Sequence, residues 1–407
     1  MREDSAVRAP SLQGLHALMR VGLALSGGGA RGAYQVGALQ ALSELLARRR
    51  LPFDVLVGAS AGAITSSFLA ARASNFPLSV KRLVDFWGHI RPEYVFRTDA
   101  RTLTQVGMKW MVDLSLGGWI GRHRAKALLM SDPLRALLEE RLDIGAVHDN
   151  IERGLLHGIA LTTTDYRTSM GVTFFDGVPE IAPWTRSTRY GVRARLTIDH
   201  VMASSAIPIF FPAIRIGERY YADGCLRSVT PLSPAVHLGA ERILAIGIRQ
   251  PGVQLRQTMP DPKLDKYPSI ADTAGLLLNA IFVEALESDI ERLERVNETL
   301  NLVPDEVIDA NATMLRRIPL YVLRPSRDLG ALARDTLTKL PSMIQYLFRG
   351  LGVSDRTGWD LLSYLAFDRT YTSKLLALGY SDVMADAEAL VHFITPPAER
   401  DASEAQA

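Results

Sequence analysis

The sequence predicts an α/β protein: a three-layer sandwich in which helices cover both faces of a mostly parallel central sheet, followed by a helical C-terminal extension. Residues 21–25 and 53–57 are apolar runs of strand length, and each is followed by a turn of small residues and then by a helical pattern. A chain that begins strand, helix, strand, helix forms a parallel sheet covered on both faces, because its crossover connections are right-handed.

Hydrophobic spacing predicts the remaining elements in chain order. Residues 33–48 form a helix whose apolar residues share one face, and residues 63–71 form the helix after the second strand. Residues 75–145 are mostly helical, where a lid or an acyl-chain pocket could lie. Strands are expected at residues 155–162, 169–174, 243–248 and 319–323, and a hairpin-like stretch at residues 213–221. Helices are expected at residues 196–205, 269–300 and, in several pieces, 329–394.

This order of elements divides the chain into four expected parts. Residues 1–20 are a loose N-terminal arm, residues 21–330 are the core, residues 331–395 are the helical extension, and residues 396–407 are a flexible tail. Within the core, residues 251–268 are polar and rich in proline, which indicates a linker or an exposed loop.

Composition excludes several classes of protein. Lys and Arg total 46 against 44 Asp and Glu, a net charge of +2, so nothing indicates a nucleic-acid partner. The single cysteine, Cys225, cannot form an internal disulfide and fits a reducing cytoplasm. No apolar run approaches the roughly 18 residues of a membrane span, so we expect a cytoplasmic protein whose contact with membranes is peripheral.

The string Gly58-Ala59-Ser60-Ala61-Gly62 follows the second predicted strand. It matches the G-x-S-x-G elbow, in which a tight turn between strand and helix exposes a nucleophilic serine. All four neighbours of Ser60 are small, as a strained turn requires. A glycine-rich turn in which Ser60 merely caps the next helix would give the same string.

The string Gly27-Gly28-Gly29-Ala30-Arg31-Gly32 follows the first predicted strand. Its backbone N–H groups could stabilise an oxyanion. Gly27, Gly29 and Gly32 also spell the dinucleotide-binding pattern, which needs an acidic residue at the end of the second strand. Glu44 falls inside a helix and Asp54 opens that strand instead of closing it, so the nucleotide interpretation is the weaker alternative.

A serine nucleophile needs a base. Of the eight histidines, only His237 and His392 come late enough for a Ser-Asp-His order, and both lie in helical patterns. Asp223 follows a strand-like run and precedes Gly224, so a desolvated carboxylate could serve instead. An ordinary Asp-Gly turn between strands is the alternative for this pair.

Three ordered motifs, Gly27 to Gly32, Gly58 to Gly62 and Asp223-Gly224, together resemble the patatin-like phospholipase family. The segment 203–208 and Phe211-Pro212 also resemble the stretch before that family's aspartate, and the resemblance covers residues 21–235. It implies a serine acylhydrolase with a Ser-Asp dyad and no histidine. Ser60 then matches the nucleophile and Asp223 the acid, while the oxyanion-loop positions are Gly27, Gly28, Gly29 and Arg31.

One departure from that pattern concerns the dyad. The family usually has Gly or Ala after Asp-Gly, whereas this chain has Cys225, whose bulk could shift Asp223. Arg31 either positions the loop and offsets charge near it or is a surface arginine at the start of a helix. Residues 359–380 also resemble a C-terminal helical extension of bacterial relatives.

The expected function is hydrolysis of acyl esters, with phospholipids, lysophospholipids or other lipids as substrates. The oxyanion would be held by the glycine loop and by the amide of Ala61, the residue after the nucleophile. The mechanism needs neither a metal ion nor a cofactor. Alternatives are a catalytically weak lipid-binding or scaffold protein of the same fold and a nucleotide-binding oxidoreductase.

Two surface patterns could contact a membrane. A basic stretch could meet anionic headgroups, although a solvated surface explains it as well. A helical apolar stripe could face lipid or pack on the core. The basic residues are Arg186, Arg189, Arg193 and Arg195, and the stripe is Leu337, Leu340, Ile344, Leu347 and Leu351.

Overall fold

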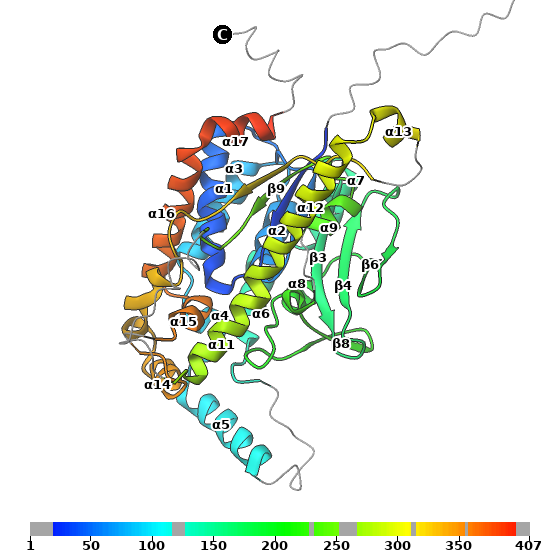
Figure 1. The fold of residues 1–407 in the computed structure, drawn as a ribbon. Helices are drawn as coiled ribbons and strands as arrows, with labels where there is room; N and C mark the ends of the chain where they lie inside the picture. The colour runs from blue at the N-terminus through cyan, green and yellow to red at the C-terminus, as the bar shows by residue number, and fades with distance from the viewer. Residues whose placement is uncertain are drawn as a thin grey trace, which may run out of the picture.

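A single large sheet runs through the centre of the molecule, with helices on both sides (Figure 1). The computed structural model describes residues 19–115, 127–227, 232–251, 267–310, 315–354 and 357–395. Most of the predicted arm and of the loop 251–268, and the whole predicted tail, lie outside these residues. The α/β fold class with a mostly parallel, helix-covered sheet is confirmed.

Five neighbouring strands of the sheet are parallel. Their spatial order is β10 (Leu320–Leu323), β9 (Arg242–Ile246), β1 (Val21–Leu25), β2 (Val55–Gly58) and β3 (Gly158–Asp165). The strand β4 (Gly171–Gly177) pairs antiparallel with β3. Beyond it lie β6 (Arg189–Arg193) and the two-residue β5 (Trp184–Thr185). The carboxyl ends of the parallel strands therefore meet at one edge, where α/β proteins place their ligands.

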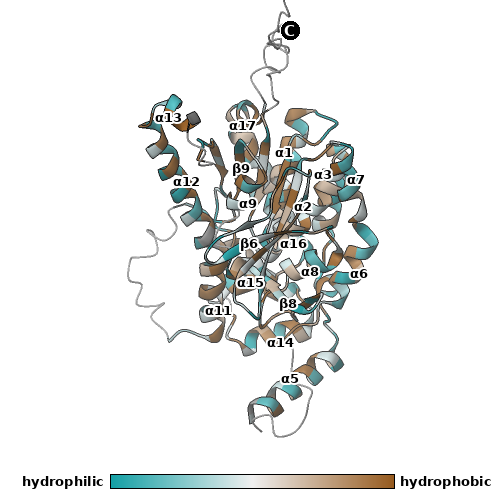
Figure 2. Cartoon of the chain, turned by 90° about the vertical axis from the view of Figure 1, so that its right-hand side faces the viewer, coloured by the Kyte–Doolittle hydropathy of each residue, from teal (hydrophilic) through white to brown (hydrophobic). Residues whose placement is uncertain are grey.

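Side chains alternate between two apolar layers along the central strands. Leu23, Leu25 and Leu56 belong to the larger cluster, whereas Ala24 and Val57 belong to the smaller one. The larger layer packs against α1 (Ala33–Leu46), α2 (Ala61–Ala71) and α3 (Phe76–Gly88). The smaller layer packs against α9 (Leu232–His237) and α12 (Ala285–Asn301). Figure 2 shows α12 and α2 on opposite sides of the sheet.

Within the described residues the predicted helical regions are largely helical, with adjusted ends, and residues 116–126 of the predicted region 75–145 lie outside them. The predicted single helix 269–300 is α11 (Ile270–Asn279) and α12, joined by a π-helical turn, Ala280–Glu284. None of the described helices is long and apolar enough to cross a bilayer. The other helices are α4 (Pro92–Val95), α5 (Ala100–Ser115), α6 (Asp132–Arg141), α7 (Gly145–Glu152), α8 (Ile198–Ser204), α13 (Asp305–Ala310), α14 (Ser342–Gly350), α15 (Trp359–Leu365), α16 (Arg369–Ala385) and α17 (Ala387–Ile394).

The C-terminal helices pack directly on the N-terminal half of the chain. The helix α16 runs along α1, and two glycines allow the backbones to approach closely. A Cβ added at Gly37 would lie 2.0 Å from the carbonyl oxygen of Leu376, and one at Gly379 would lie 2.0 Å from that of Tyr34. The hydroxyl of Tyr34 donates to Asp382 at 3.0 Å across the same contact.

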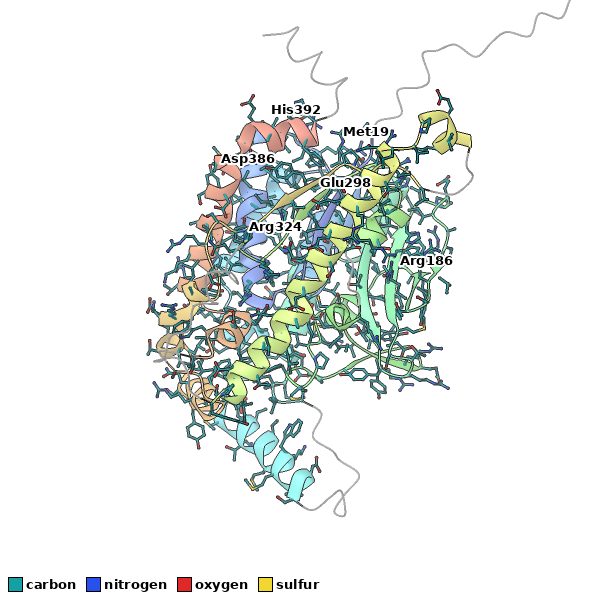
Figure 3. All side chains as sticks on the ribbon, in the orientation of Figure 1. Met19, Arg186, Glu298, Arg324, Asp386 and His392 are labelled. Carbon is teal, nitrogen blue, oxygen red and sulfur yellow. The ribbon has the colours of Figure 1, made fainter. Side chains whose placement is uncertain are left out.

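The two surface patterns have structural explanations. Leu337, Leu340 and Ile344 are buried in the larger apolar cluster, so this stripe packs on the core. The basic stretch contains β6, a strand between β4 and the edge strand β5, which was not predicted because arginines hide its alternation. Figure 3 shows Arg186 at the outer edge of the sheet. Arg193 donates to the carbonyl oxygens of Gly177 and Val178 at 2.6 and 2.9 Å, so it braces a loop instead of standing free.

Candidate active site

The topology brings the ends of two strands together on one side of β3. The strand β2 ends at Gly58, which pairs with Leu161, and the antiparallel β8 (Arg219–Asp223) ends at Asp223, which pairs with Thr163. Leu161 and Thr163 are two residues apart on β3, a distance of roughly 7 Å. The ends of β2 and β8 therefore face each other across this short gap on the same side of β3. Ser60 leaves the end of β2 and Asp223 closes β8, which places the two predicted catalytic residues side by side.

Ser60 stands at a strained turn between β2 and α2. Its backbone φ of 53° and ψ of −123° lie in a region that non-glycine residues rarely adopt. A Cβ at Gly58 would lie 2.3 Å from the carbonyl oxygen of Gly62, and a Cβ at Gly62 would lie 2.3 Å from that of Leu25. The side chain of Ser60 makes no capping hydrogen bond to α2, so the helix-cap alternative is wrong.

Ser204 and Ser205, two serines of the segment 203–208, form hydrogen bonds with the backbone of Ser60. The amide of Ser60 donates to Ser204 Oγ at 3.1 Å, and that hydroxyl donates to the carbonyl oxygen of Thr162 at 2.7 Å. The hydroxyl of Ser205 lies 3.3 Å from the carbonyl oxygen of Ser60. These contacts link the elbow to β3, because Thr162 belongs to that strand.

Asp223 is fixed by its backbone and by one carboxylate oxygen. Its amide donates to the carbonyl oxygen of Ala206 at 2.9 Å, and its Oδ1 accepts from the amide of Cys225 at 2.9 Å. Gly224 is required beside it, since a Cβ there would lie 2.3 Å from the carbonyl oxygen of Thr162. Asp223 is only 1% exposed.

The second oxygen of Asp223 is free for the serine. Oδ2 has no hydrogen bond of standard geometry from the described residues, yet the hydroxyl of Ser60 lies near enough to lower the pKa of the carboxyl. Catalytic hydrogen bonds are often loose before substrate binds. Burial is the larger influence and raises the pKa of Asp223 to about 6, against the opposing effects of the Cys225 amide and the Ser60 hydroxyl.

The glycine loop lies beside these two residues. Gly29 adopts a φ of 52°, and Gly28 precedes a short 3₁₀ turn, Gly29–Gly32, that leads into α1. The first amides of a helix have no partner within it, and none of the hydrogen bonds among the described residues uses the amides of Gly28, Gly29 or Ala61. These N–H groups are therefore available to an anionic oxygen.

A small apolar cavity connects the loop to the elbow. Gly29, Ser60 and Ala61 line it together, and its volume of about 30 Å³ holds on the order of one or two water molecules. Its other walls are almost entirely apolar. They are formed by Ile64, Phe86, Trp87, Ile90, Val95, Leu134, Ser205, Ile207, Phe211 and Phe367. Ser60 is 2% exposed, so a lipid chain can reach it only after some of these side chains move.

Arg31 is buried, so the interpretation of Arg31 as a surface arginine is wrong. It is 4% exposed and points away from the cavity toward α15, where it meets Asp360, Ser363 and Tyr364. Sequence reasoning missed these partners, and it also missed Ser204 and Phe367 as parts of the site. The three partners on α15 lie about 330 residues away in the chain, so no local pattern could reveal them.

Cys225 lies between the glycine loop and Asp223. Its side chain lies against Gly27, where an added Cβ would come within 2.5 Å of Sγ. Burial, followed by the charge of Asp223, raises the pKa of the thiol well above its ordinary value, so the thiol stays protonated. The carboxylate of Asp223 accepts from the amide of Cys225 at 2.9 Å, and the thiol of Cys225 lies close enough to the same carboxylate to lower its pKa as well.

The late histidines stand apart from the site, as their helical patterns indicated. His237 ends α9 and stacks on Trp184 at 4.6 Å, and burial lowers its pKa to about 4. His392 lies on α17. No histidine lines the cavity of Ser60 among the described residues.

Comparison with known proteins gives one family and several relatives. The model of a family described as patatin-like phospholipase matches residues 23–236. A cGAMP-activated phospholipase of Pseudomonas aeruginosa is 28% identical over 245 residues, which are 58% of this chain and 64% of the relative. The match therefore spans slightly less than two thirds of that relative's length.

Solved structures of bacterial proteins resemble the chain more distantly. VipD from Legionella pneumophila is 15% identical, with 88% of this chain and 67% of that chain covered and a TM-score of 0.30. ExoU in its complex with SpcU, from the type III secretion system of Pseudomonas aeruginosa, is 17% identical, with coverages of 92% and 76% and a TM-score of 0.27.

Proposed function

Because this chain belongs to the patatin-like phospholipase family, we propose that it hydrolyses acyl esters of lipids, with Ser60 as nucleophile and Asp223 as general base. One observation supports the proposal above the others. A buried carboxylate with one unoccupied oxygen lies beside a serine hydroxyl held at a strained turn. A glycine-rich turn without catalytic purpose needs neither the strain nor the unpaired carboxylate.

The first half of the reaction acylates Ser60. Asp223 takes the hydroxyl proton as Ser60 Oγ forms a bond to the ester carbonyl carbon. The developing oxyanion accepts hydrogen bonds from the amides of the Gly27 to Gly29 loop and of Ala61. When the ester C–O bond breaks, the departing alcohol oxygen receives the proton from Asp223, and the acyl group stays on Ser60.

The second half releases the fatty acid. A water molecule attacks the acyl carbon while Asp223 takes one of its protons, and the same amides hold the second oxyanion. The bond to Ser60 Oγ then breaks and the proton returns to that oxygen. With a pKa of about 6, Asp223 is mostly ionised at neutral pH and can act as the base without a histidine.

The apolar cavity supports a lipid substrate. Its walls suit the acyl chain next to the scissile ester, and its small volume requires an opening motion before the chain enters. We propose phospholipids and lysophospholipids as substrates, reached at a membrane surface. We also retain the division into an N-terminal arm, a core over residues 21–330, a helical extension and a tail as a proposal.

A substrate panel tests this function. Release of fatty acid from phospholipids, lysophospholipids and short-chain esters is measured for the wild type and for Ser60→Ala, with circular dichroism to confirm that both are folded. The proposal expects turnover of at least one ester class by the wild type and none by Ser60→Ala. Turnover by purified Ser60→Ala would contradict it, and lipid binding without any turnover by the wild type would favour the scaffold alternative.

A further inference from the structure

The glycine loop is held from the side opposite Ser60 by residues from the second half of the chain. A Cβ added at Gly29 would lie 2.1 Å from the carbonyl oxygen of Tyr364, so the backbone of α15 touches the loop directly. A Cβ at Gly27 would lie 2.8 Å from the ring of Phe282. Both contacting residues follow the family match, which ends at residue 236.

Arg31 ties the same loop to α15 through its guanidinium. Nε donates to Ser363 Oγ at 2.8 Å, and Nη2 donates to Asp360 Oδ1 at 2.9 Å. Nη1 donates to the hydroxyl of Tyr364 at 3.1 Å and to Asn279 Oδ1 at 3.3 Å. A buried arginine with this many partners holds one orientation, because losing any of them would leave buried donors unpaired.

Tyr364 is the centre of the arrangement. Its side chain is fully buried, and its ring lies 4.0 Å beneath the guanidinium of Arg31. Its hydroxyl accepts from Arg31 and donates to Asn279 Oδ1 at 2.8 Å. Its ring also stacks on Phe282 at 5.2 Å, with 29° between the ring planes. Tyr364 therefore contacts Gly29 and Arg31 of the glycine loop, and it also contacts Phe282, whose ring lies against Gly27.

The local backbone supports the same assignment. Phe282 lies in the π-helical turn between α11 and α12, and such turns occur frequently at functional sites. The turn offsets the helix where Phe282 reaches Gly27 and where Asn279, at the end of α11, reaches Tyr364. Three segments of the second half of the chain thus converge on a loop of the first half.

We propose that Tyr364 is a positioning residue for the oxyanion loop, acting through Arg31 and through its backbone contact with Gly29. This inference rests on the proposed function, since it assigns a role in the same reaction. Oxyanion donors act only when they point at the place where the charge develops, so a loop that shifts slightly loses turnover more than it loses substrate binding. A tyrosine that merely fills the core would affect stability alone.

The test replaces the hydroxyl and keeps the ring. Tyr364→Phe removes the contacts with Arg31 and Asn279 but retains the stacking on Phe282 and the backbone beside Gly29. The matched control is Tyr34→Phe, which removes the hydroxyl of an equally buried tyrosine; that hydroxyl donates to Asp382 on α16 and makes no hydrogen bond to Arg31 among the described residues. Fatty-acid release is measured for both variants, the wild type and Ser60→Ala, together with melting temperatures.

The proposal expects kcat of Tyr364→Phe to fall roughly tenfold with KM within about twofold of the wild type, less than the 10² to 10³ for deletion of a donor itself. Tyr34→Phe is expected to keep kcat within about twofold, with a similar change in melting temperature. Arg31→Lys is expected to lose kcat as well, and the double variant to lose little more than either single one, because both act through one contact.

Three results would overturn the proposal. They are a kcat for Tyr364→Phe equal to that of Tyr34→Phe, a loss confined to KM, or strictly additive losses in the double variant. If Tyr364→Phe does not fold, Ser363→Ala takes its place, since it removes the acceptor of Arg31 Nε together with a local hydrogen bond from Ser363 Oγ to the carbonyl oxygen of Asp360. A wild type no faster than Ser60→Ala would overturn the proposed function itself, so the two failures are distinguishable.

Discussion

At the scale of single residues, the proposed base Asp223 is a carboxylate in the role that a histidine often has in serine hydrolases. Its burial opposes ionisation, whereas the Cys225 amide, the Ser60 hydroxyl and the Cys225 thiol favour the charged form. The pKa of about 6 therefore lies just below neutral pH, where a base is both ionised and reactive. A solvated aspartate with an ordinary pKa would be a weaker base at the same pH.

The pH dependence of turnover follows from this pKa. The base must be ionised, so kcat/KM is expected to rise with pH and to level off above an apparent pKa of about 6. Burial lowers the pKa values of His200 and His237 to about 4, so their titration would not change kcat/KM near pH 6. A profile measured on a short-chain ester that stays flat from about pH 5 to 8 would contradict the assignment.

Stability has the opposite pH dependence at this residue. The carboxyl has a pKa of about 6 when folded and 3.8 as its ordinary value, so its contribution is fully present below pH 3.8 and is lost as pH rises through 6. About two pKa units correspond to about 3 kcal/mol. Asp223→Asn avoids this loss, and it is expected to gain stability over the wild type between about pH 4 and pH 8 in urea unfolding. If the difference in unfolding free energy between Asp223→Asn and the wild type stays constant over this pH range, Asp223 is not a buried carboxyl that ionises there.

Cys225 is expected to be replaceable. Its amide holds Asp223 Oδ1, and its protonated thiol lies against Gly27 and near the Asp223 carboxylate, so the amide contact survives in Cys225→Ala, which should retain activity within about threefold and lose about 1 kcal/mol of stability. Cys225→Leu has no room beside Gly27 and should lose both. Initial rates and melting curves check this, and inactivity of folded Cys225→Ala would mean that the thiol takes part in the reaction.

Ser60 was predicted from its small neighbours, because a strained turn requires them. Asp223 was preferred to an ordinary Asp-Gly turn only through the family resemblance. The sequence could not assign Arg31, whose partners Asp360, Ser363 and Tyr364 are distant in the chain. Burial of an arginine depends on what covers it, and local spacing carries no information about that.

At the scale of elements, the site depends on the meeting of β2 and β8 along β3. Both strands were predicted, but their head-on arrangement was not, since pairing between distant strands leaves no mark on local periodicity. The edge strand β5 was missed because it has only two residues, and its neighbour β6 was missed because it is rich in arginine. The break between α11 and α12 was missed because a π-helical turn keeps a helical pattern.

The elbow gives a prediction at this scale. Gly62→Ala places a Cβ 2.3 Å from the carbonyl oxygen of Leu25 and is expected to lose on the order of 3 kcal/mol and all activity. Gly107→Ala on α5 is the matched control, because nothing lies within 4 Å of the added Cβ, and it should gain about 0.5–1 kcal/mol. Urea unfolding distinguishes the two, and a stable, active Gly62→Ala would contradict the described turn.

At the scale of the whole molecule, the C-terminal helices complete the core that carries the site. The helix α16 covers α1, and α15 covers the glycine loop. The sequence predicted these helices as an extension, but the close backbone contacts at Gly37 and Gly379 become evident only in three dimensions.

Truncation tests how far this extension is separable. A chain that ends at residue 330 exposes the apolar face of α1 and leaves Arg31 without Asp360, Ser363 and Tyr364. We expect it to lack a cooperative thermal transition and to aggregate, because the core loses a layer of packing. A monodisperse fragment with a sharp transition and retained turnover would show that residues 331–395 are dispensable.

The central claim, that Asp223 activates the hydroxyl of Ser60, is tested most directly by covalent labelling. A fluorophosphonate is incubated with the wild type, Ser60→Ala and Asp223→Asn, and adducts are mapped by peptide mass spectrometry. We expect one adduct on Ser60 in the wild type, none at that position in Ser60→Ala, and labelling of Asp223→Asn slowed by about 10² or more. An adduct on another residue, or equal labelling rates for the wild type and Asp223→Asn, would contradict the claim.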